Sequence, residues 1–141
     1  MDNLLTMRIS DDPADDTYAI IACTSAPGAG PPLHVQNEME CFLVTEGLYE
    51  FTLNGVTQRR GPGSYVRVPV GVAHSYVNVA GQPSKMLIFA MPGRDHVGFL
   101  LAAGDRLPPG ETGATPRPAP DPATLHATAA RFGITFLPTP I

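Results

Sequence analysis

The sequence is poor in the features that identify secreted, membrane-spanning and nucleic-acid-binding proteins. It contains only two cysteines, Cys23 and Cys41, too few for a disulfide framework, and its first residues show no secretory signal. No apolar run approaches the roughly 20 residues needed to cross a bilayer. A net charge of -4 gives no electrostatic reason to expect nucleic acid or an anionic membrane as a partner. We therefore expect a soluble cytoplasmic protein with free thiols.

Short β-prone runs and regularly spaced turn signals dominate residues 18–91. A length of 141 residues fits one domain. Asn54-Gly55 is a strong hairpin signal, because both residues tolerate a positive φ. Many short strands with evenly placed turns predict an all-β fold, a sandwich or jelly-roll barrel of two antiparallel sheets. The expected strands are residues 18–23, 41–44, 48–53, 56–58, 65–68, 75–79 and 85–91.

The C-terminal third has a different composition. Arg94–Ala103 is expected to form a short helix, whereas residues 105–122 hold six prolines in 18 residues and cannot form a regular helix or a central strand. An N-cap at Asp121, Pro122 in the first turn and a stop at Gly133 predict a terminal helix, followed by a strand at residues 134–137. We expect a barrel over residues 1–104, with a proline-rich crossing segment and terminal helix packed on it over residues 105–141, as one domain overall.

Two segments place metal-ligand side chains in an otherwise apolar region. His34 and Gln36 share a strand face because they are two residues apart, and Glu40 shares it if that strand continues. His74 follows the turn at residues 69–71. Imidazole and carboxylate donors suit Zn, Fe, Ni, Cu or Mn. The sequence predicts one divalent transition metal held by these four residues. The alternative is that the two histidines are buried and bonded to Glu40 without a metal.

Several tyrosines and one further carboxylate are weaker candidates. Tyr76 should share the face of His74, where it would either orient a phenolic or carbonyl substrate or pack in the core. Tyr49 and Tyr65 are further candidates for lining the cavity. Glu38 is expected to be a solvated loop carboxylate, with a role as substitute ligand or base as the alternative. The side chains expected on the surface are His96, His126 and the carboxylates of Asp11, Asp12, Asp15 and Asp16.

The spacing of these residues resembles the two signature motifs of the cupin family. The first motif, G-x5-H-x-H-x3-E-x6-G, has Gln36 in place of its second histidine and otherwise matches at Gly28, His34, Glu40 and Gly47. The second, G-x5-P-x-G-x2-H-x3-N, matches in full at Gly63, Pro69, Gly71, His74 and Asn78. The resemblance implies a cupin jelly-roll barrel. The proline-rich crossing segment with a terminal helix is similar to the arrangement in the small single-domain quercetin-dioxygenase-like cupins.

This resemblance also implies a class of chemistry. It implies metal-dependent oxidation of a small hydrophobic, aromatic or enol-bearing substrate, with His34, Glu40 and His74 on the metal and Glu40, His74 and Tyr76 as catalytic candidates. One alternative is a non-oxidative cyclase, isomerase or dehydratase acting on a polyketide-like molecule. Another is a metal-free cupin that binds a small ligand. Since small barrels of this family commonly pair through a sheet edge, and residues 18–24 are apolar on both faces, a homodimer is expected.

Overall fold

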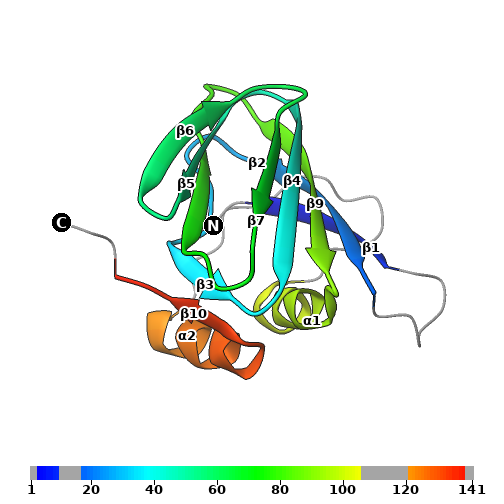
Figure 1. The fold of residues 1–141 in the computed structure, drawn as a ribbon, viewed down its shortest axis with the longest axis vertical. Helices are drawn as coiled ribbons and strands as arrows, with labels where there is room; N and C mark the ends of the chain where they lie inside the picture. Colours follow the sequence, from blue (N-terminus) through cyan, green and yellow to red (C-terminus); the bar gives the residue numbers. More distant parts are fainter. Residues whose placement is uncertain (1–2, 10–16, 106–120, 139–141) are drawn as a thin grey trace.

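Two packed five-stranded antiparallel sheets form the body of the molecule (Figure 1). The computed structural model describes residues 3–9, 17–105 and 121–138. The strand orders are β1-β2-β9-β4-β7 and β10-β3-β8-β5-β6. The expected all-β jelly-roll architecture is confirmed. The strands are β1 Asn3–Ile9, β2 Ala19–Ser25, β3 His34–Gln36, β4 Met39–Glu46, β5 Tyr49–Leu53, β6 Val56–Arg60, β7 Tyr65–Val68, β8 His74–Asn78, β9 Ser84–Met91 and β10 Ile134–Phe136.

Alternating side chains of the two sheets meet in one apolar core. In β2, every second residue from Ala19 to Ser25 is buried, as expected for a strand with one face on the core. Phe42 lies near the centre, and its ring centroid is 5.3 Å from that of Phe51 and 5.6 Å from that of Tyr76. The core is therefore largely aromatic on the side that adjoins the polar end of the barrel.

Two turns fix the register of the strands that carry polar side chains. Asn54 has φ 48° and Gly55 has φ 83°, which is the left-handed geometry that the predicted hairpin between β5 and β6 requires. Gly71 also has a positive φ, of 78°, and its N–H donates to the carbonyl of Gln36 over 3.1 Å. That hydrogen bond ties the turn before β8 to β3, so His74 begins its strand directly opposite His34.

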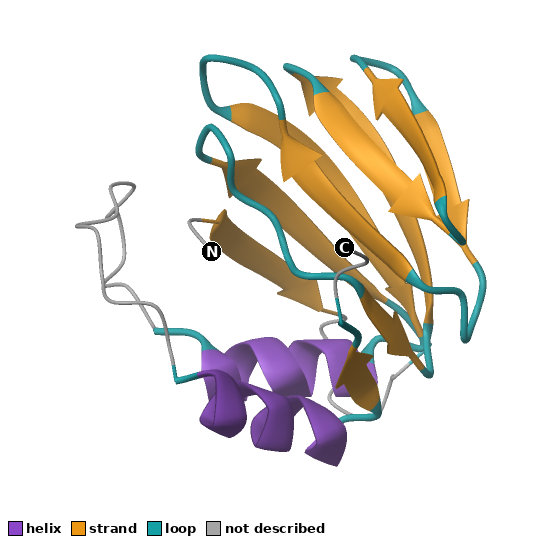
Figure 2. Ribbon diagram, turned by 90° about the vertical axis from the view of Figure 1, so that its left-hand side faces the viewer, coloured by secondary structure: helices purple, strands orange, loops and turns teal. Residues whose placement is uncertain are grey.

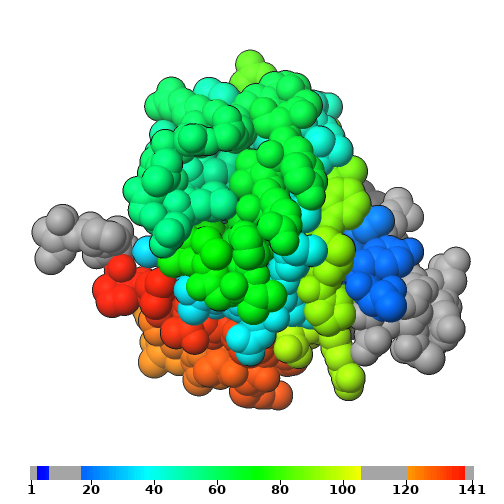
Figure 3. Space-filling model, in the orientation of Figure 1, coloured from blue at the N-terminus to red at the C-terminus, as the bar shows by residue number. Residues whose placement is uncertain are grey.

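Two helices lie together at one end of the sheets (Figure 2). Helix α1, Arg94–Ala103, has the predicted bounds, and helix α2, Pro122–Arg131, begins after Asp121, whose carboxylate accepts a hydrogen bond from the N–H of Thr124. Phe99, Ala129 and Ile134 form a second small core between the helices and β10. Strand β10 then pairs with β3, so this C-terminal segment packs directly against the end of the barrel (Figure 3).

Two details differ from the sequence-based expectations. Strand β1 was not expected, and it pairs with β2, so β2 lies between β1 and β9 instead of forming a bare edge. This removes one argument for the homodimer, which itself stays a prediction. Residues 37–38 bend the chain from one sheet to the other, so β3 does not continue into β4. The acidic cluster and residues 106–120 of the proline-rich segment lie outside the described residues.

Candidate metal centre

Three strands from both sheets bring the predicted ligands together at the helix-bearing end of the barrel. His34 and Gln36 come from β3, and His74 comes from its partner β8, with the two imidazole centroids 4.2 Å apart. Glu40 comes from β4 in the opposite sheet, because the bend after Gln36 carries the chain across. The ligand atoms of His34, Glu40 and His74 all lie within 4.8 Å of one another. These three residues are among the four predicted ligands, although Glu40 faces the histidines across the barrel and does not share their strand.

Backbone carbonyls fix the orientation of both histidine rings. Nδ1 of His34 lies 2.8 Å from the carbonyl oxygen of Pro32, and Nδ1 of His74 lies 2.9 Å from that of Val72. A carbonyl only accepts hydrogen bonds, so each Nδ1 carries the hydrogen and each neutral ring keeps its lone pair on Nε2. This arrangement of a ligand histidine held by a carbonyl is the usual one in metal sites.

The electrostatics favour the protonation states that a metal requires. Burial, together with the neighbouring His74, lowers the pKa of His34 to about 4, so its ring is neutral at neutral pH. Burial alone would raise the pKa of Glu40, but the nearby His96, His74 and His34 outweigh it and lower this pKa to about 2. Metal ligation needs a neutral imidazole and an ionised carboxylate, so both groups are ready to bind.

Two features of the site are compatible with a bound cation. Nε2 of His74 lies 2.9 Å from Oε2 of Glu40, which places a lone pair against a carboxylate oxygen when His74 is neutral. Oε1 of Gln36 is buried without a hydrogen-bond partner among the described residues, while the amide nitrogen of Gln36 donates to the carbonyl of Glu38 over 3.4 Å. Ligand atoms that converge from three residues, with an unpaired amide oxygen on the same strand as His34, fit a divalent metal ion.

Comparisons with known proteins agree with the fold described above. Residues 22–90 match the Cupin domain family. The structure resembles the cupin domain of Schizosaccharomyces pombe Cnp3 at a TM-score of 0.58 and 18% identity, over 64% of this chain and 65% of that one. A Cupin 2 conserved barrel domain protein from Salinispora arenicola matches at a TM-score of 0.57 and 20% identity, over 63% of this chain and 75% of that one.

The chain belongs to the cupin superfamily. A curated relative, quercetin 2,3-dioxygenase from Bacillus subtilis, is 30% identical to this cupin over 79 residues, which is 55% of the chain. The aligned part spans only 23% of that relative's length, and the matched part of Cnp3 is under two thirds of its chain. These likenesses show the family and the fold of this cupin. Neither helix in the described part of the chain is long and apolar enough to span a bilayer.

The structure corrects two expectations about residues near the centre of this cupin. Glu38 is not a solvated loop carboxylate, because it is 4% exposed and accepts hydrogen bonds from the first N–H groups of α1. His96 is not a surface residue: its side chain is 13% exposed, and its Nδ1 lies 3.0 Å from Oε1 of Glu40. A helix N-terminus attracts a carboxylate through its unpaired N–H groups, and no local sequence pattern signals this pairing.

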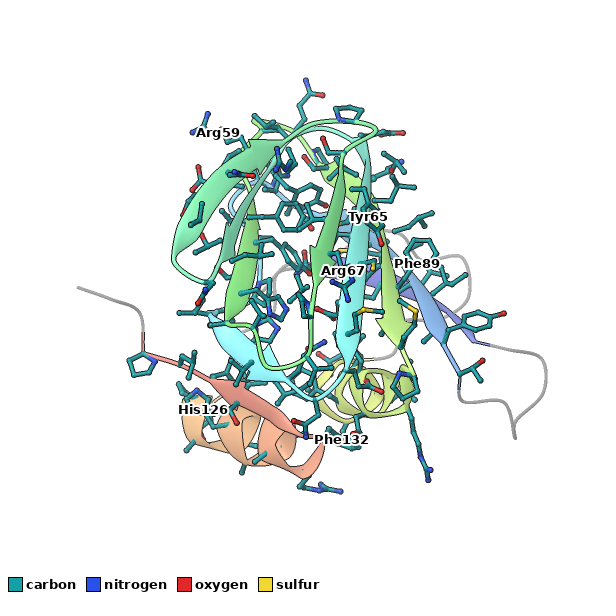
Figure 4. The ribbon with its side chains drawn as sticks, viewed as in Figure 1. Arg59, Tyr65, Arg67, Phe89, His126 and Phe132 are labelled. Atoms are coloured by element: carbon teal, nitrogen blue, oxygen red, sulfur yellow. The ribbon has the colours of Figure 1, made fainter. Side chains whose placement is uncertain are left out.

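The three candidate tyrosines occupy three different environments. Tyr76 shares the interior face with His74 as expected, but its hydroxyl interacts with the thiol of Cys23. Tyr49 is fully buried, and its hydroxyl donates to the carbonyl of Ser84 over 2.9 Å. Tyr65 is 59% exposed on β7 (Figure 4), where its hydroxyl contacts Cys41, so it does not line the interior. Neither Tyr49 nor Tyr65 contacts a ligand residue.

The predicted surface location is confirmed for His126. It is exposed on α2, at the periphery of the molecule (Figure 4), and its ring stacks on Phe136 at a centroid distance of 5.2 Å. Phe136 in turn lies 5.9 Å from the ring of His34. His126 therefore lies outside the ligand set, which makes it a suitable control position.

A groove of about 330 Å³ opens between the facing edges of β6 and β7. None of the ligand residues lines it, but Leu53 on its floor lies opposite His74 in the pairing of β5 with β8. Leu53 thus lies between the groove and the candidate metal centre. Its walls are apolar at Phe51, Leu53, Val56 and Val66, and polar at Gln58, Arg60, Tyr65 and Arg67.

We expect the metal-free protein to lose stability as the pH falls from 6.5 to about 4. The pKa of His34 is about 4 in the folded chain and has an ordinary value of 6.5, so the unfolded chain binds the proton first. Its contribution to folding is present above pH 6.5 and disappears as the pH drops through that window. Urea unfolding at a series of pH values measures this slope. His34→Asn, which keeps a donor near the Pro32 carbonyl, should flatten it, and an unchanged slope would contradict the assignment.

Proposed function

We propose that this cupin is a metal-dependent enzyme acting on a small aromatic or enol-bearing molecule, with oxygenase chemistry of the quercetin-dioxygenase type as the favoured reaction. The observation that carries the proposal is the convergence of His34, Glu40 and His74, with both imidazoles held in the ligand tautomer. The 30% identity to a quercetin 2,3-dioxygenase over 79 residues supports the oxidative direction. Gln36 is the fourth proposed ligand, through its unpaired amide oxygen.

The side chains around the centre have separable roles in this proposal. A bound transition metal would polarise a substrate oxygen and, if redox-active, support oxygen chemistry. Glu40 is the candidate base: it is an ionised carboxylate, 2% exposed, and able to take a proton from a substrate hydroxyl. His74 orients Glu40 through their 2.9 Å contact. Burial and the nearby Cys23 raise the pKa of Tyr76 well above its usual range, so Tyr76 stays a neutral phenol in the wall behind the site.

The surroundings of the centre support a hydrophobic or aromatic substrate. The ring of Phe42 lies 6.3 Å from that of His74, and the ring of Phe136 lies 5.9 Å from that of His34. The groove between β6 and β7 has an apolar floor that reaches Leu53, beside His74. We propose that the substrate approaches along this groove, with its planar apolar part between the sheets and its reacting oxygen toward Glu40.

Gln36 favours a second candidate of a different class. A neutral amide oxygen is a poorer donor to a transition metal than the imidazole that it replaces, which weakens the case for redox chemistry. A non-oxidative cyclase, isomerase or dehydratase needs only a Lewis acid, or an acid and a base such as Glu40 and His74. A metal-free cupin that binds a small ligand is the third candidate.

Elemental analysis of protein prepared without added metal separates these candidates. We expect about one equivalent of Fe, Ni, Cu or Mn per chain, together with oxygen uptake when a flavonol such as quercetin is added. Glu40→Gln is the matched control, since it removes the base and weakens the ligand set. Zinc without oxygen uptake would favour the non-oxidative enzyme. Protein that neither contains nor binds any of these metals would exclude the proposed metal centre.

A further inference from the structure

We propose that His96 is a further ligand of the metal centre and supplies the imidazole that the first motif lacks at Gln36. The inference rests on the proposed metal centre and extends its ligand set beyond the two motifs. His96 comes from helix α1, which follows the last strand of the barrel core, and neither motif contains it. Its placement depends on two carboxylates, Glu38 and Glu40, and on the unpaired atoms around them.

A buried carboxylate holds the first turn of α1 at the site. Oε1 of Glu38 accepts the N–H of His96 over 2.7 Å, and Oε2 accepts the N–H of Asp95 over 3.3 Å. The same residue accepts the side-chain amide of Gln36 at its backbone carbonyl. Glu38 therefore contacts Gln36 through its backbone carbonyl and His96 through its carboxylate. Burial of a carboxylate is costly unless it is well bonded, so this anchor fixes the helix terminus specifically here.

The ring of His96 meets Glu40 without forming a hydrogen bond. Nδ1 of His96 lies 3.0 Å from Oε1 of Glu40, yet the directions do not suit a hydrogen bond, and Nδ1 has no other partner among the described residues. Within the part of the chain that the structure describes, the buried side-chain polar atoms without a partner are this nitrogen and Oε1 of Gln36. Both lie on residues joined through Glu38. A buried nitrogen without a partner, 3.0 Å from a carboxylate oxygen of the proposed centre, indicates that a partner is missing there.

The two oxygens of Glu40 face two different histidines. Oε2 lies 2.9 Å from Nε2 of His74, and Oε1 lies 3.0 Å from Nδ1 of His96. Nitrogen and oxygen ligands lie about 2.0–2.2 Å from zinc, so neighbouring ligands on one ion are about 3.0–3.6 Å apart, depending on the coordination number. His96 is not part of the group of three whose ligand atoms all lie within 4.8 Å of one another. If Glu40 held an ion through both oxygens, His74 and His96 would each adjoin one of them, and the His96 ring would have to shift toward the other histidines to join the ligand set.

Nitrogen counting on a copper probe tests this inference. One equivalent of Cu²⁺ is added to the metal-free protein, and electron paramagnetic resonance with spin-echo modulation counts the coordinated imidazoles. We expect three in the wild type and two in His96→Ala, with at least a tenfold weaker Zn²⁺ affinity by competition titration. His126→Ala, which removes an exposed imidazole from α2, should leave both readouts unchanged. The double variant Gln36→His, His96→Ala should regain the third imidazole.

The outcomes separate this inference from the proposed function. If His96→Ala keeps the wild-type nitrogen count and Zn²⁺ affinity while His74→Ala loses binding, His96 is not a ligand and the metal centre stands. If the wild type binds neither Cu²⁺ nor Zn²⁺ at its histidines, the metal centre and the role of His96 both fail. Circular dichroism identifies a variant that has not folded. In that case His96→Gln, which keeps the side-chain bulk and removes the imidazole, must show the same loss of one coordinated nitrogen. Three coordinated imidazoles in His96→Gln would overturn the inference.

Discussion

Replacing His74 with alanine should weaken metal binding by more than about 100-fold, because losing even an outer-shell partner of a metal ligand costs about 10- to 100-fold. His74 is 1% exposed, its ring is held by the Val72 carbonyl, and its Nε2 faces Glu40. The measurement is a Zn²⁺ competition titration, supported by the metal content of the purified protein.

The control for this variant is His126→Ala, because His126 is exposed on α2 and lies outside the ligand set. It should bind metal like the wild type. His74→Ala also removes bulk from the core, so both proteins are compared by thermal melting in the metal-free state. Metal content and affinity that survive in a folded His74→Ala protein would show that the three-residue group does not hold the ion.

Phe42→Ala should destabilise the fold by about 3–5 kcal/mol, the usual range for removing a buried phenylalanine. Phe42 is 1% exposed and packs against Phe51 and Tyr76 between the two sheets. The surrounding rings are too large to close the resulting cavity. Since domains are typically stable by only about 5–15 kcal/mol, this variant should lie near the limit of folding. Urea unfolding of the metal-free protein measures the loss.

Phe89→Ala provides the matched comparison on β9. Phe89 is partly exposed, because its neighbours Ile88 and Ala90 fill the inward positions of that strand (Figure 4). Phe89→Ala should lower the free energy of unfolding by less than half as much as Phe42→Ala, because folding buries less apolar surface at this position. Equal losses for the two variants would show that the sheets are not packed around Phe42 as described.

The placement of His34, Gln36 and His74 was predictable because it depends on short-range spacing, whereas Glu40 was named from the motif and reaches them from the opposite sheet. The turn at residues 69–71 sets where β8 begins, and alternation along β3 places His34 and Gln36 on the same face. The hairpin at Asn54-Gly55 was predictable for the same reason, since two local φ values decide it. In each case a few neighbouring residues determine the backbone, and the side-chain direction follows.

Glu38 and His96 could not be predicted because their environments come from distant parts of the chain. Nothing near Glu38 in the sequence shows that α1 will present its N–H groups to it, 57 and 58 residues away. His96 lies on a helix with a weak apolar pattern, so its burial depends on how α1 docks. The bend after Gln36 was missed because no proline or glycine marks it. Contacts of this kind become visible only when both sheets and the C-terminal segment are in place.

The pairing of β3 with β10 has a consequence for the order in which the protein is assembled. Strand β3 is three residues long, and one of its two edges is completed by Ile134–Phe136, near the far end of the described chain. Contacts between such distant segments form slowly, because a long loop must close first. We therefore expect His34 and Gln36 to reach their final positions late in folding, after most of the barrel. During synthesis the ion would then be captured only once β10 has left the ribosome.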